Sequence, residues 1–123
     1  MLLINIGDAW LHQYEDKQQA KMLYQQGLNL WLDMQRVDDG LGIVRGLSGM
    51  AEVAAAQGQA ERAGRLFGAA DRLLPATSSY RDDVNRRVAE ARALLDATAF
   101  TAGWTAGQAM TLEQAVTGSL QDA

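Results

Sequence analysis

Apolar and small residues recur every three or four positions along almost the whole chain, and this spacing is the strongest constraint on its fold. Only one proline, Pro75, interrupts the pattern, and no long stretch alternates apolar with polar residues as a half-buried strand does. With 48% apolar residues in 123 positions, the chain can bury the core of one ordinary domain. We therefore expect a single all-α domain, residues 1–123, of six or seven helices.

The first three helices are expected from their apolar faces and their end signals. One that starts at Lys17 has a broad inner face, which consists of Ala20, Leu23, Tyr24, Gly27, Leu28, Trp31 and Met34. A second starts near Asp39 and ends at Gly58, because glycine accepts the left-handed conformation common just past a helix end. A third runs from about Gln59 to Leu74, since Pro75 cannot continue the hydrogen-bond ladder.

Small residues predict that the second and third helices form a close antiparallel pair. Ala51 and Ala54 on one helix are expected to meet Ala63 and Ala70 on the next, across the short turn at Gly58. Larger side chains at such a crossing would overpack it.

A helix capped by Ser79 is expected after Pro75, and its inner face consists of Val84, Val88, Ala91 and Leu95. Its charged residues lie four apart as the pairs Asp82 with Arg86, Asp83 with Arg87, and Arg86 with Glu90. Such pairs are typical of a solvated helix face and add only about 0.2–0.5 kcal/mol each.

Two more helices are expected in the C-terminal part. One follows Asp96 and aligns Phe100 with Trp104, beside the small residues Gly103 and Gly107. That glycine spacing allows close helix approach, and we interpret it as internal packing rather than a membrane dimer motif. Thr111, followed by Gln114, matches a capping box that opens the last helix, which is expected to bury Leu112, Val116 and Leu120.

Residues 39–77 match a 34-residue helical repeat when counted from Val44. Gly58, Ala63, Phe67, Ala70 and Pro75 fall on the turn glycine, alanine, aromatic, alanine and terminal proline of that repeat, so the segment resembles a tetratricopeptide repeat. Residues 1–37 follow the repeat loosely, and residues 79–121 fit no full repeat and are expected to cap the stack. The resemblance implies a right-handed stack of antiparallel helix pairs with C-terminal capping helices.

The pieces "LFGAAD" and "AFTAGWTAGQAMTLEQAV" extend the resemblance. With the repeat, they resemble the C-terminal end of tetratricopeptide regions in large bacterial regulators, namely LuxR-type and antibiotic-regulator-type transcription factors and signalling proteins with NB-ARC-like ATPases. This implies a non-catalytic module that binds a protein, a peptide or a small ligand, or that serves the upstream domains of a larger regulator. The glycine-lysine phosphate loop and the basic recognition helix of such regulators do not occur in these residues.

Composition excludes several kinds of site. The chain has no cysteine and one histidine, so thiolate and multi-histidine metal sites are excluded and no metal or cofactor is expected. The formal charge of −4 does not supply the positive field that nucleic-acid binding needs. The apolar start "MLLINI" is too short for a membrane span and lacks a basic leader, so we expect a cytoplasmic protein.

The resemblance places a partner- or ligand-binding surface on the concave face, which the first helix of each pair lines. The candidate residues on that face are Asp8, Leu11, His12, Arg45, Ser48, Glu52, Ala55 and Ala56. Their polar members either hold a peptide or small ligand or line an ordinary solvated groove. Asp8 and His12 lie four apart, as in a general-base pair, but an exposed ion pair is the alternative because no nucleophile or metal accompanies them.

The N-terminal part leaves two further alternatives. Trp10, Tyr14, Tyr24 and Trp31 form either an aromatic pocket or part of the core. The apolar stretch "MLLINIGDAW" favours packing against an upstream repeat or a second copy, because an uncovered repeat edge exposes core-like surface. The alternative to a binding module is therefore a self-associating unit that dimerises through its first helix.

Overall fold

The computed structural model describes residues 7, 9, 11–13, 16–34, 40–75 and 77–121, with Leu30 to Met34, Gly40 to Gly42, Leu112, Leu120 and Gln121 described for their backbone only. Six helices and no strand are present in these residues, which confirms the all-α prediction. The helices are α2 (Lys17–Met34), α3 (Gly40–Ala56), α4 (Ala60–Leu73), α5 (Arg81–Leu94), α6 (Ala97–Gln108) and α7 (Leu112–Gln121). None of the helices in the described ranges is long and apolar enough to cross a bilayer.

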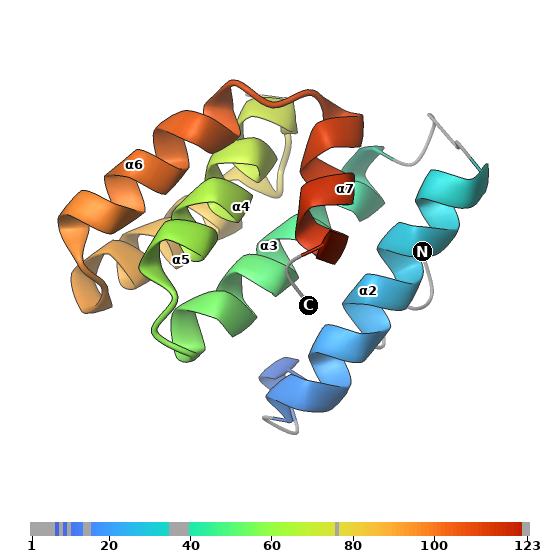
Figure 1. The fold of residues 1–123 in the computed structure, drawn as a ribbon, viewed down its shortest axis with the longest axis horizontal. Coiled ribbons are helices and arrows are strands. Elements are labelled where there is room, and N and C mark those ends of the chain that lie inside the picture. The colour runs from blue at the N-terminus through green and yellow to red at the C-terminus, as the bar shows by residue number, and fades with distance from the viewer. Residues whose placement is uncertain are drawn as a thin grey trace.

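A tight turn at Gly58 joins α3 to α4, and the two helices run antiparallel (Figure 1). Gly58 has a φ of 76°. The Gln59 N–H donates to the Ala54 carbonyl at 2.9 Å, and the Gly58 N–H donates to the Ala55 carbonyl at 3.1 Å. These two bonds form a Schellman motif that satisfies the last carbonyls of α3, so the predicted role of Gly58 is confirmed.

The core between these helices is built on small side chains. Ala51, Ala54, Ala63 and Ala70 are all completely buried in one hydrophobic cluster, together with Phe67. At the end of α4, Leu74 is extended, as expected for a residue that precedes proline, and the helix ends there.

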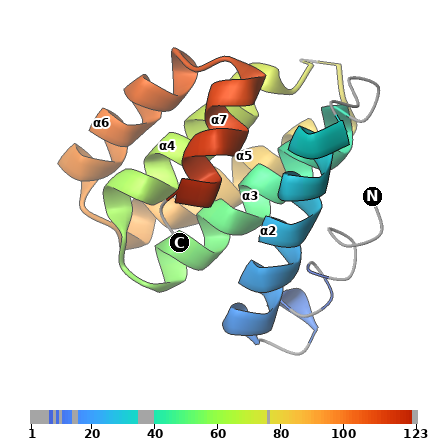
Figure 2. The same ribbon diagram turned by 45° about the vertical axis from the view of Figure 1, so that its right-hand side comes forward.

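Four glycines bring the backbones of α4 and α6 together, and the two helices lie side by side in Figures 1 and 2. A Cβ atom on Gly64 would lie 2.1 Å from the Phe100 carbonyl oxygen, and one on Gly68 would lie 2.5 Å from that of Trp104. From the other side, a Cβ on Gly107 would lie 2.1 Å from the Arg65 carbonyl oxygen. The interpretation of Gly103 and Gly107 as internal packing is confirmed, and Gly64 and Gly68 are their partners.

Polar contacts around Asp71 hold α4, α5 and α6 together at one end. The Asp71 carboxylate accepts hydrogen bonds from Arg81 of α5 and, at 2.8 Å, from Gln108 of α6. Gln108 also donates to the Gly68 carbonyl at 2.9 Å. These contacts link α4 to the first residue of α5 and to the last residue of α6.

The helix α7 belongs to the segment 79–121, which was expected to cap the stack. It returns to pack on α2, α3 and α4, and it lies between α2 and α4 in both views (Figures 1 and 2). Ala115 and Val116 are buried there. The buried face of α7 therefore joins the core that α2, α3 and α4 share.

Of the caps predicted for the C-terminal helices, that of α7 is confirmed and that of α5 is wrong. The capping box is confirmed, since the Thr111 N–H donates to Gln114 Oε1 at 3.0 Å and the Gln114 N–H donates to Thr111 Oγ1 at 3.2 Å. Ser79 is not a cap. The helix starts one residue later, after Tyr80, whose N–H donates to Ser78 Oγ at 3.2 Å.

Candidate functional site

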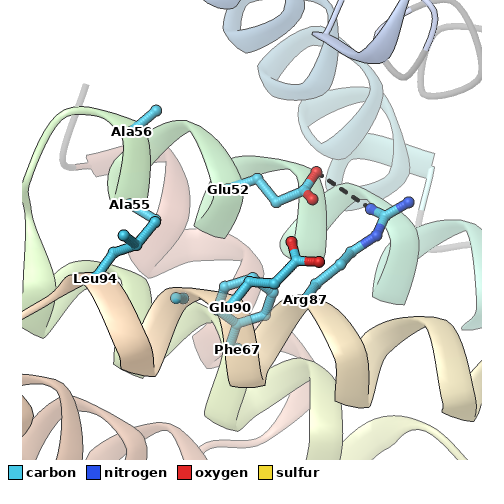
Figure 3. A pocket seen from close by; sticks show the side chains of 8 residues that line it. Glu52, Ala55, Ala56, Phe67, Arg87, Glu90 and Leu94 are labelled. Atoms are coloured by element: carbon cyan, nitrogen blue, oxygen red, sulfur yellow. Dashed lines mark hydrogen bonds and ion pairs between the residues drawn. The ribbon is translucent and has the colours of Figure 1, made fainter.

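A cavity of about 200 Å³ opens between α3 and α5, and we call it the α3–α5 groove (Figure 3). Its lining consists of Glu52, Ala55, Ala56, Phe67, Arg87, Glu90, Ala91 and Leu94. Phe67 belongs to α4 and is completely buried, so it forms the floor. The last two turns of α3 and the second half of α5 form the two walls.

One end of the groove is apolar. Ala55 and Ala56 come from the last turn of α3, and Leu94 ends α5 beside them (Figure 3). Leu94 is 85% exposed. Among the described residues, Met22 on α2 is the other exposed large apolar side chain, at 52%. Leu94 thus continues the apolar lining of the groove out to the surface.

The other end is charged and ordered by ion pairs. Arg87 donates through Nη1 to Glu52 Oε2 at 3.2 Å, and its Nη2 lies 2.9 Å from Asp83 Oδ2. His12 Nε2 also lies 2.8 Å from Glu52 Oε2. The Arg87 side chain is only 12% exposed, and its guanidinium lies 5.8 Å from the centre of the Tyr80 ring. The pair with Glu52 thus links α3 to α5 across the groove.

The structure brings four of the predicted site residues together. Glu52, Ala55 and Ala56 line the groove, and His12 reaches Glu52 at its edge. The predicted partner of His12, Asp8, lies outside the described residues. An imidazole held by a carboxylate resembles a general base with its orienting group, but a reaction also needs a nucleophile or a metal. In the described ranges, no group of three or more metal-ligating side chains occurs.

The other predicted residues lie elsewhere. Arg45 is half-buried, and Leu11 packs against the core. Ser48 is completely buried, and its hydroxyl has no hydrogen-bond partner among the described residues, so it does not line the accessible surface on which we expected it. At the next position of α3, the helix α2 packs closely against it. A Cβ on the adjacent Gly49 would lie 2.2 Å from Tyr24 Cζ.

The same contact decides the role of Tyr24, which is completely buried and belongs to the core rather than to an open aromatic pocket. Trp10 and Tyr14 lie outside the described residues, as does the side chain of Trp31. Of the stretch 1–10 that carries the predicted dimerisation surface, the structure describes only residues 7 and 9.

Sequence reasoning missed the whole α5 wall of the groove. The Asp83–Arg87 pair is confirmed, but Arg86 pairs with Asp83 three residues before it and not with Glu90. Arg87 and Glu90 both line the groove opposite Glu52 of α3, and Glu90 is also exposed to solvent. One signal in the sequence could have indicated this wall. Leu94 is a leucine that lies outside the buried stripe of Val84, Val88 and Ala91.

Comparison of the chain with protein-family models, with curated proteins and with solved structures found no match. The α3–α5 groove is therefore characterised by its own chemistry. That chemistry combines an apolar end, an exposed leucine and two carboxylates.

Proposed function

We propose that this chain is a non-catalytic protein-binding module and that the α3–α5 groove holds a segment of its partner. In the larger context, the module serves as the interaction arm of a bacterial signalling or transcriptional regulator. The observation that carries the proposal is the groove itself, in which the exposed Leu94 continues an apolar lining next to ordered charges.

The volume of the groove favours a protein partner over a small molecule. Pockets for drug-sized ligands and cofactors have roughly 300–1,000 Å³ and bury most of the ligand. The α3–α5 groove has about 200 Å³, which accommodates one or two side chains. Protein interfaces are organised in this way, with a few anchor side chains in pockets and a polar rim around them.

The helix arrangement supports the tetratricopeptide part of the proposal. The hairpin α3–α4 is followed by α5 and α6, and the second helices of the two pairs, α4 and α6, lie side by side (Figure 2). The groove lies between the first helices, α3 and α5, which is where the resemblance places the partner surface. The displaced helix α7 is a departure from a regular stack.

A selection with a random dodecapeptide library displayed on phage tests the proposal. We expect the selected peptides to bind the full chain and to lose binding, by tenfold or more, to a Leu94→Asp variant. Because Leu94 is 85% exposed, this substitution leaves the core intact.

Met22→Asp is the matched control, since it places the same charge on the other exposed large apolar side chain, 52% exposed on α2. Peptides that bind wild type and both variants equally would show that the groove is not the binding surface. Light scattering across a hundredfold concentration range adds a separate outcome. A dimer that Leu94→Asp dissociates would identify a second copy as the occupant and would contradict the proposal.

A further inference from the structure

We infer that the partner segment anchors in the α3–α5 groove through an arginine side chain, whose guanidinium binds Glu52 and Glu90. This inference rests on the proposed function and specifies the chemistry of the partner. Three features of the groove carry it: a Glu52 oxygen to which no described residue donates, a Glu90 carboxylate that pairs with no described cation, and an apolar end beside both.

One carboxylate oxygen of Glu52, Oε1, is available to accept a hydrogen bond from a partner. The contacts of His12 and Arg87 both fall on Oε2, at 2.8 and 3.2 Å. No hydrogen bond to Oε1 is made by the described residues, although the Glu52 side chain is only 22% exposed. A partly buried carboxylate that is held in place by two donors on one oxygen is a preorganised acceptor on the other.

Glu90 is the second acceptor. It lines the groove one helical turn after Arg87, and among the described residues it takes part in no ion pair, because Arg86 pairs with Asp83 instead. Figure 3 shows the carboxylates of Glu52 and Glu90 at the same end of the groove, one from each wall, with Arg87 next to them. The titratable lining therefore carries two negative charges and one positive charge, and Arg87 shares its charge with Asp83.

The apolar end of the groove suits the stem of a long basic side chain. Ala55, Ala56 and Leu94 offer small and aliphatic surface, and the carboxylates lie further along (Figure 3). Arginine and lysine bury their methylene stems against such surface and keep the charged head in a polar setting. Arginine fits better than lysine, because its planar fork donates several hydrogen bonds to two acceptors at once.

The test uses the dodecapeptides that depend on Leu94. We expect them to share an arginine, and we expect its replacement by glutamine to weaken binding to wild type about fivefold or more, near the upper end for an exposed ion pair. In the Glu90→Gln variant, the same replacement should have a clearly smaller effect, because the charge that the arginine binds has been removed. Glu113→Gln, an exposed acid on α7, is the matched control and should leave the affinity unchanged.

The outcomes separate the inference from the proposed function. Peptides that need Leu94 but tolerate the loss of arginine, or that lose equal affinity in wild type and Glu90→Gln, would overturn the arginine anchor and leave a groove that binds apolar segments. Failure to select any Leu94-dependent peptide would overturn the proposed function itself, and the arginine anchor with it.

Discussion

Gly103 on α6 lies directly against the backbone of Glu61 on α4, so that a Cβ atom on Gly103 would stand 2.0 Å from the Glu61 carbonyl oxygen. Three more glycines repeat this relationship along the same two helices. Backbones this close gain weak Cα–H···O contacts and dispersion energy over the whole length of the crossing. The helices α5 and α6 form the second hairpin, and α6 reaches the core through this crossing. The position of the second hairpin therefore depends on the absence of side chains at these four glycines.

Substitution of Gly103 by alanine should destabilise the fold by about 3 kcal/mol, the upper end for overpacking, because the methyl group meets rigid backbone. Thermal unfolding should show a fall of roughly 10 °C in the melting temperature. Gly118→Ala on α7 is the control, since a Cβ there meets nothing within 4 Å. It should stabilise by up to about 1 kcal/mol through helix propensity. Equal effects of the two substitutions would contradict the close α4–α6 contact.

Ala63→Leu should cost about 1–3 kcal/mol, because Ala63 is completely buried in the core cluster that α3 and α4 share. The matched substitution Ala102→Leu introduces the same side chain at an exposed position of α6 and should change stability by less than about 0.5 kcal/mol. Urea denaturation of both variants measures the difference. An unchanged midpoint for Ala63→Leu would refute this packing.

Gly58→Ala should cost about 1–2 kcal/mol although the site is open, because a Cβ at Gly58 has no neighbour within 4 Å and the whole penalty comes from the positive φ. Gly58→Asn should cost less, since asparagine tolerates the left-handed conformation. Urea unfolding of the two variants shows which of them loses more stability. If alanine is tolerated better than asparagine, the turn does not depend on this conformation.

Asp71→Ala should destabilise by about 1–3 kcal/mol, because the donors of Arg81 and Gln108 lose their shared acceptor. The exposed Asp82 serves as the control, and Asp82→Ala should have little effect. Hydrogen exchange should also show faster amide exchange in α5 and α6 for Asp71→Ala alone. Protection that is unaltered in both helices would mean that these contacts do not hold the second hairpin.

Much of the secondary structure was predictable because its signals are local. The ends of α3 and α4 follow from Gly58 and Pro75, which act through the conformations of their own backbones. The capping box of α7 was predictable for the same reason, since Thr111 and Gln114 bond to each other. The prediction that Ser79 caps α5 was wrong, because two neighbouring serines can serve one helix start. Ser78, not Ser79, accepts the hydrogen bond from the Tyr80 N–H.

The sequence by itself determined that the chain is helical, where α3 and α4 begin and end, and which alanines are buried between them. Only the tertiary structure decided that α7 packs between α2 and α4, that Gly64 and Gly68 meet Gly103 and Gly107, and that Glu90 and Leu94 join Glu52 in one groove. The physical reason is that periodicity identifies the face a helix buries, whereas the neighbour that covers that face is selected by the packing of all the helices together.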